Sequence, residues 1–205
     1  MLEVLIDYSR HSLGLLPLMA LLFAAGVAII IERLVFFARS IRAGASLEYD
    51  LEQLAAGNLA DATRLAEHYA SCIQGRLVRA ALAANGKVEG RFERDLDEAI
   101  MFQLPRLDHN LWVLDTAVTL GPLLGLLGTI IGMIESFNVL GLAGTSNPMA
   151  VGGGIAHALV ATAFGLAIAI VCVMFLNYFN KRIRLVNNQM DLIKSMLVSR
   201  FSAPA

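Results

Sequence analysis

The fold is decided by the run from residue 116 to residue 180, TAVTLGPLLGLLGTIIGMIESFNVLGLAGTSNPMAVGGGIAHALVATAFGLAIAIVCVMFLNYFN. Within it Glu135 is the only charged residue and His157 the only histidine. Because a helix needs about 20 mostly apolar residues to cross a bilayer, this run is long enough for two spans and a turn. The turn is predicted in GLAGTSNPMAVGGG, which is rich in helix-breaking and loop-forming residues. We therefore predict membrane helices over 116–139 and 155–179, joined by a loop over 140–154.

An earlier apolar stretch, LGLLPLMALLFAAGVAIII over 13–31, predicts a first membrane helix that ends at the charged pair Glu32–Arg33. Glu3 and Asp7 precede it, whereas a secretory signal carries positive charge at that place. The composition agrees, because 57% hydrophobic and 16% charged residues leave too few polar side chains to cover a soluble globule. The sequence thus predicts an all-α membrane protein with three transmembrane helices and long cytoplasmic helical extensions.

The orientation follows from the basic residues, which are retained on the cytoplasmic side of a membrane. Of 16 Lys and Arg residues, one precedes the first span, ten separate the first two spans, none lies in the second loop, and five follow the third span. We therefore expect an external N-terminal segment over 1–12, an external loop over 140–154, and cytoplasmic helical regions over 32–115 and 180–205. Cys72 in the cytoplasm and Cys172 in a span are both compatible with free thiols.

Several functional classes are disfavoured by what the sequence lacks. It contains no glycine-rich phosphate loop, GxSxG, HExxH or Rossmann fingerprint, and its two cysteines belong to no metal-binding motif. A net charge of −1 provides no basic surface for nucleic acid. We expect neither an enzyme nor a protein that needs a metal or a cofactor.

The cytoplasmic regions have helical periodicity, with expected breaks near Gly57–Asn58 and Asn85–Gly86. Two apolar seams recur at spacings of three and four residues, and Pro105 is expected to kink the first. Either the helices project and pack on neighbouring helices, or they fold back on their own chain. The seams are Phe92, Leu96, Ile100, Leu104, Leu107 and Leu111 before the second span, and Ile183, Val186, Met190, Ile193 and Leu197 after the third.

The second and third spans carry stripes of small residues, which allow helices to approach closely within a membrane. Packing within one chain and packing between copies explain these stripes equally well. The predicted packing residues are Gly121, Gly125, Gly128 and Gly132 in the second span, and Gly154, Ala158, Gly165 and Ala169 in the third.

Four polar side chains in these spans are candidates for ion movement. Thr129 and Thr162 lie near mid-span and can offer hydroxyls to ions, water or a carboxylate, or satisfy them on their own helix. Glu135 and His157 lie farther out, at matching depths. For this pair a proton relay or gate, a static hydrogen bond and exposure at the outer interface all stay open.

The second and third predicted spans resemble those of a known protein family. The segment GPLLGLLGTIIGMIESF over 121–137 resembles the second-span signature of the ExbB/TolQ/MotA proton-channel family, and GIAHALVATAFGLAIAI over 154–170 resembles its third. With one earlier span and a cytoplasmic helical insert, the resemblance covers essentially the whole chain. It is closer to the ExbB/TolQ branch than to the four-span flagellar branch.

The resemblance implies a stator in the bacterial inner membrane, in which five copies of this chain surround two copies of a single-span ExbD/TolR-like partner. In that family a membrane aspartate of the partner carries protons, and the matching threonines, here Thr129 and Thr162, line its path. Protons are then the transported ion and no cofactor is implied. The resemblance implies that proton flow drives mechanical work, which is transmitted to the outer membrane or cell wall through the partner and, in the ExbB case, through a TonB-like protein.

Three positions depart from the family pattern. His157 stands where ExbB and TolQ usually have glutamate in GIAEAL, Val171 replaces the proline of the AIPA stretch, and Glu135 takes a place where asparagine is common. A carboxylate has in effect moved from the third span to the second. We expect an ExbB-like stator that energises TonB-dependent import, with a TolQ-like energiser of envelope constriction or surface motility, or a non-conducting membrane scaffold, as alternatives.

Overall fold

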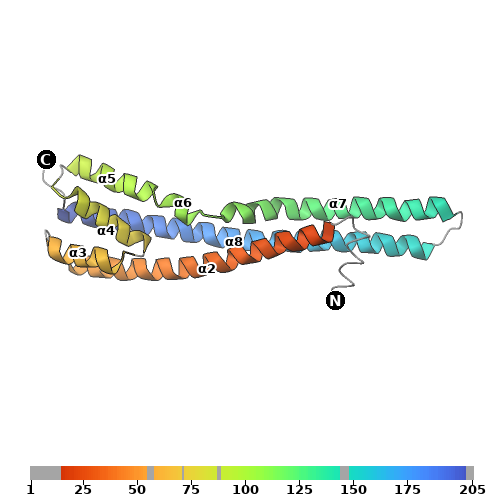
Figure 1. The fold of residues 1–205 in the computed structure, drawn as a ribbon, viewed down its shortest axis with the longest axis horizontal. Coiled ribbons are helices and arrows are strands. Elements are labelled where there is room, and N and C mark those ends of the chain that lie inside the picture. The colour runs from red at the N-terminus through yellow and green to blue at the C-terminus, as the bar shows by residue number, and fades with distance from the viewer. Residues whose placement is uncertain (1–14, 55–57, 71, 87–88, 144–147, 202–205) are drawn as a thin grey trace. The chain divides into compact units, whose positions relative to one another are not determined.

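The computed structural model describes residues 15–54, 58–70, 72–86, 89–143 and 148–201, and all its regular elements there are helices (Figure 1). The all-α prediction is therefore confirmed for the described residues, while the pentamer remains a prediction. The helices are α2 (Leu15–Gln53), α3 (Leu59–His68), α4 (Ile73–Ala84), α5 (Glu89–Met101), α6 (Leu104–Leu107), α7 (Leu111–Ala143) and α8 (Pro148–Phe201).

The chain divides into two compact units. Unit 1 consists of Met1–Ile31 and Asn110–Asn177, and unit 2 of Glu32–His109 and Tyr178–Ala205. The long helices α2 and α8 each contribute residues to both units.

Three helices are long and apolar enough to cross a membrane: Leu15–Gln53, Leu111–Asn138 and Gly152–Phe201. At most 28% of any of their most apolar windows is buried within the single chain. Most of the apolar surface is thus left for lipid or for other protein chains. The three membrane helices expected from the sequence are present, and the exact ends of their embedded parts remain predictions.

The predicted loop over 140–154 is partly helical, because α7 continues to Ala143 and α8 already begins at Pro148. Proline suits the first position of a helix, where its missing N–H would have no partner in any case. The core of the expected turn, 144–147, and the expected external segment 1–12 lie outside the described residues.

Both long helices extend well past the apolar stretches that predict their membrane spans. At 1.5 Å per residue, the 39 residues of α2 reach about 58 Å and the 54 residues of α8 about 81 Å. Since about 20 residues suffice to cross a bilayer, each helix is much longer than a single crossing requires.

Unit 2 has an apolar core of its own, built largely from the parts of α2 and α8 that belong to it. Phe37 of α2 stacks on Phe179 of α8 with ring centroids 5.8 Å apart. Farther along, the Arg200 side chain donates to the Leu54 carbonyl at 2.9 Å. The predicted seam of α8 is buried within this chain, through Val186, Met190, Ile193 and Leu197.

The seam before the second span is interrupted, although the sequence predicts one kinked helix. The helix stops at Met101, restarts as the four-residue α6 and stops again before α7. Pro105 lies in the first turn of α6 and has no N–H to continue the α5 ladder. Leu104 is consequently 38% exposed, whereas Leu107 and Leu111 are buried.

Candidate functional site

In unit 1, α7 and α8 run side by side (Figure 1). They meet through small residues that let the two backbones approach. A Cβ atom added at Gly125 would lie 2.9 Å from Thr162 Cα, and one at Gly132 would lie 2.7 Å from Ala158 Cβ. Both distances are shorter than 3.0 Å, the smallest separation that Cβ atoms normally have from other heavy atoms. A larger residue at either position would therefore force the helices apart. Contacts of this interface involve all the predicted packing positions, Gly121, Gly125, Gly128, Gly132, Gly154, Ala158, Gly165 and Ala169.

Thr129 and Thr162 lie at this interface about one helical turn apart. The Thr162 hydroxyl donates to the backbone carbonyl of Gly125 across the helix pair, at 2.9 Å. Thr129 lies four residues after Gly125 in α7, about 6 Å along the helix axis, and its side chain is buried, with 8% of the residue exposed. Its hydroxyl donates to the Leu126 carbonyl of its own helix at 2.7 Å.

This hydrogen bonding limits what the two threonines can do chemically. Each hydroxyl has one hydrogen, which is already given to a backbone carbonyl, so its oxygen retains only acceptor lone pairs. Such an oxygen can accept a hydrogen bond from a protonated carboxylic acid, whereas it has no hydrogen to give a carboxylate. The pair therefore favours a neutral acid over a charged one.

Glu135 and His157 are both exposed in the single chain. Since Gly154 packs against Ser136, Glu135 is level with Ile155 in this antiparallel helix pair. His157 is two residues away, about 3 Å along the axis.

Glu135 directly precedes Ser136, which faces α8, and His157 directly precedes Ala158, which faces α7. In an antiparallel helix pair, the residues that directly precede two facing residues lie on the same side of the pair. The structure thus brings Glu135 and His157 to one flank at nearly one level.

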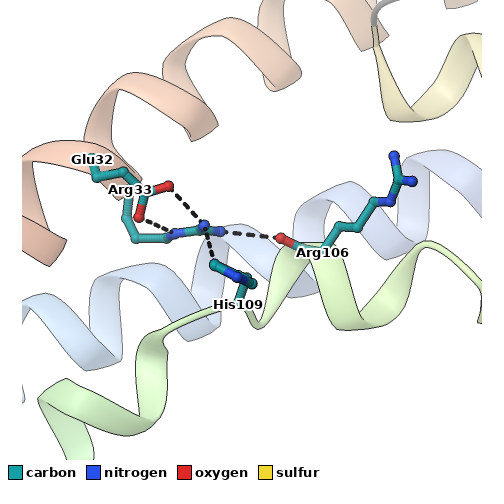
Figure 2. A network of polar contacts seen from close by, with 4 residues as sticks. All are labelled: Glu32, Arg33, Arg106 and His109. Atoms are coloured by element: carbon teal, nitrogen blue, oxygen red, sulfur yellow. Dashed lines mark hydrogen bonds and ion pairs between the residues drawn. The ribbon is translucent and has the colours of Figure 1, made fainter.

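A second polar network lies in unit 2, around a buried arginine that directly follows the first apolar stretch (Figure 2). Arg33 is 3% exposed, and its Nε and Nη2 donate to the two carboxylate oxygens of Glu32 at 3.0 and 2.8 Å. Its Nη1 donates to the Arg106 carbonyl at 3.1 Å, and its Nη2 lies 3.2 Å from His109 Nδ1. The guanidinium carbon also lies 4.9 Å from the centre of the Phe36 ring.

The turn between α3 and α4 contains two groups with shifted ionisation. Burial and a 2.7 Å hydrogen bond to Asp50 raise the pKa of Tyr69 to about 12. Burial also raises the pKa of the Cys72 thiol, which accepts from Gly75 N and caps α4. Cys72 and Cys172 are both free thiols, and the raised pKa of Cys72 keeps it in the unreactive form.

The network around Arg33 was not foreseen from the sequence. The available signal was the Glu32–Arg33 pair at the end of an apolar stretch, since a charge at that place needs partners. His68 of α3 is exposed and packs edge-on to Tyr69.

Comparison with known proteins assigns the chain to a family. The sequence model of the MotA/TolQ/ExbB proton channel family matches residues 70–192. The chain belongs to this family. The matched region contains both threonines, Glu135 and His157, and the resemblance noted in the sequence is confirmed.

Similar curated proteins carry ExbB names. A biopolymer transport protein from Synechocystis, named ExbB-like 3, is 36% identical over 155 residues, which cover 75% of this chain and 74% of that protein. ExbB-like 1 of the same organism is 28% identical over 92% of this chain and 74% of its own length. The ExbB protein of Xanthomonas campestris is 34% identical over 89 residues, 43% of this chain and 35% of that protein.

Family membership and the three apolar helices together make this chain a multi-pass membrane protein of a proton-channel family. Its relatives are transport proteins, and protons are the ion that the family conducts. Among the described residues no group of His, Cys, Asp and Glu side chains is arranged to hold a metal ion.

Proposed function

We propose that this chain is the ExbB-like channel subunit of a proton-driven stator in the bacterial inner membrane, which energises TonB-dependent transport across the outer membrane. Five copies would surround two copies of a single-span ExbD/TolR-like partner, and a TonB-like protein would receive the work. The membership in a proton-channel family and the ExbB names of the relatives support this proposal.

The observation that carries the proposal is the acceptor character of Thr129 and Thr162 at a close helix contact. A partner aspartate that reaches them in its protonated form can donate to a threonine oxygen. Once ionised it loses that contact and is costly away from water, so it must move toward hydration. Proton transfer thereby changes where the partner is most stable.

The membrane potential supplies enough energy for this motion. One charge moved through 100 mV yields about 2.3 kcal/mol, so a few protons can drive a substantial conformational change. The chain has no acidic residue in the middle of a predicted span, and we expect it to conduct poorly without its partner.

The test is proton flux into liposomes that contain the chain and its co-purified partner. Thr129→Val and Thr162→Val keep the side-chain shape but remove the hydroxyl, and both should reduce flux strongly. Thr→Ser at the same positions should restore it. Ser136→Ala is the matched control, because Ser136 is also buried at this interface and bonded to the Gly132 carbonyl. Normal flux in both valine variants would refute the assigned role.

Glu135 and His157 are proposed as a relay or gate outward of the threonines, supported by their shared flank and level. The pH dependence of flux in Glu135→Gln and His157→Gln tests this. A profile that moves in at least one variant supports the relay. Two unchanged profiles would leave the residues a packing or interfacial role.

We further propose that the N-terminus is periplasmic and the C-terminus cytoplasmic, from the distribution of Lys and Arg. A tag at Met1 that is accessible only from the cytoplasm would overturn this orientation. The partner separates the remaining alternatives, because a peptidoglycan-binding external domain would indicate a TolQ-like or motility stator.

A further inference from the structure

The contact between Arg33 and His109 depends on which ring nitrogen of the histidine carries a hydrogen. An arginine guanidinium remains charged and has only donors, so the 3.2 Å contact from Nη2 requires an acceptor at His109 Nδ1. The contact is a hydrogen bond only when His109 is neutral, with its hydrogen on Nε2. A proton added to Nδ1 would abolish the hydrogen bond and place a second cation beside the guanidinium.

The ring is accessible to protons while the arginine is not. His109 is exposed, whereas Arg33 is 3% exposed. Histidine is the side chain that titrates within the physiological pH range. The contact can thus respond to the pH of the surrounding solution.

The charged groups on the elements around His109 carry both signs, and among the described residues its ring is in polar contact with Arg33. On α2, both carboxylate oxygens of Glu32 are engaged by Arg33. On its own segment, His109 has the positive Arg106 and the adjacent negative Asp108. On α8, the first charged residues after Phe179, which packs on α2, are the positive Lys181 and Arg182.

The contact fastens a turn of the backbone to α2. His109 lies between the end of α6 at Leu107 and the start of α7 at Leu111. The next residue, Asn110, has a left-handed φ of 63°, a conformation that asparagine adopts more readily than most other residues with a side chain. Arg33 holds this turn at two points, the Arg106 carbonyl and the His109 ring (Figure 2).

We propose that His109 is a pH-sensitive latch: in its neutral form it fastens the turn between α6 and α7 to Arg33 of α2, and protonation releases it. The assignment of this turn to the cytoplasmic side, and hence to sensing of cytoplasmic acid, rests on the proposed function. On that assignment, protons that enter through the complex lower the pH at its cytoplasmic side. The lower pH releases the turn before α7, so the conformation of the complex responds to its own proton flux.

Hydrogen–deuterium exchange of the full chain in nanodiscs tests the latch. The protection factors of residues 104–114, corrected for intrinsic exchange, are compared at pH 8 and pH 5.5. We expect protection to fall several-fold at the lower pH in the wild type. His109→Asn keeps an acceptor near the Nδ1 position without titrating in this range and should remain protected at both values. His109→Lys should be weakly protected at both.

His68→Asn is the matched control, because it removes another exposed histidine of unit 2 and should leave the wild-type response intact. An equal response in His109→Asn and the wild type, or no response in the wild type, would overturn the proposal. Imidazole ¹⁵N NMR of the unmodified protein at pH 8 provides a check that needs no variant. The proposal requires the Nε2–H tautomer, and the Nδ1–H tautomer would refute it. A chain without proton flux would refute the stator while leaving these readouts valid.

Discussion

The Thr162 hydroxyl of α8 donates a 2.9 Å hydrogen bond to the backbone carbonyl of Gly125 on α7. This bond is possible because glycine lets the backbones meet, since a Cβ at position 125 would lie only 2.9 Å from Thr162 Cα. The contact that brings the helices together thus also uses the hydroxyl hydrogen of Thr162 and leaves its oxygen as an acceptor.

The first prediction concerns this close approach. Gly125→Ala should destabilise the protein by about 1–3 kcal/mol, because the added methyl group forces a backbone shift. Thermal unfolding in nanodiscs measures the effect. Gly152→Ala is the control, since a Cβ there meets nothing within 4 Å. Equal stability of the Gly125→Ala protein and the wild type would show that the helices are not packed this closely.

A second prediction compares two fully buried side chains of unit 2. Gln74 makes long hydrogen bonds of 3.4 and 3.5 Å to the Ser40 carbonyl and to Gln189, and its Oε1 has no partner. Gln74→Met should change the unfolding free energy by less than about 1 kcal/mol, because the lost bonds are offset by removal of an unsatisfied acceptor. Leu47→Ala should cost about 2–5 kcal/mol. A larger loss from Gln74→Met than from Leu47→Ala would contradict this.

Third, Tyr69 should titrate late. Its pKa is raised to about 12, so the phenol resists ionisation and its contribution to stability is complete below the unfolded value near pH 10. That contribution is lost as the pH rises through about 12. The difference between ultraviolet titrations of the wild type and Tyr69→Phe isolates this group among four tyrosines. A difference curve centred near pH 10 would contradict the prediction.

A fourth prediction separates a buried cation from an exposed ion pair. Arg33→Gln should cost about 1–3 kcal/mol, because the Arg106 carbonyl loses the donor that the buried guanidinium supplies. Lys194→Gln should cost about 1 kcal/mol or less, because its partner Asp97 is half exposed. Chemical denaturation of both variants provides the comparison, and equal losses would indicate that Arg33 is not buried.

The sequence predicts much of this molecule because hydrophobicity and length dominate the behaviour of a membrane helix. The three apolar stretches were identifiable from composition alone, and the small-residue stripe that begins at Gly121 marked the faces of α7 and α8 that meet. The seam of α8 was visible in its spacing, although spacing does not reveal whether the partner helix belongs to the same chain.

Other features depend on interactions that a sequence pattern does not encode. The break at Met101 and the exposed Leu104 follow from a proline whose effect depends on local packing. The bond between Arg33 and His109 joins residues 76 positions apart. The two are not of opposite charge, so the sequence gives no sign that they pair. The direction of each threonine hydrogen likewise requires coordinates.

Native mass spectrometry of the gently solubilised complex from its own host, with identification of every bound chain, tests the proposed stator. We predict five copies of this chain with two copies of a small single-span protein that carries a membrane aspartate. A stable assembly without such a partner would contradict the proposed stator.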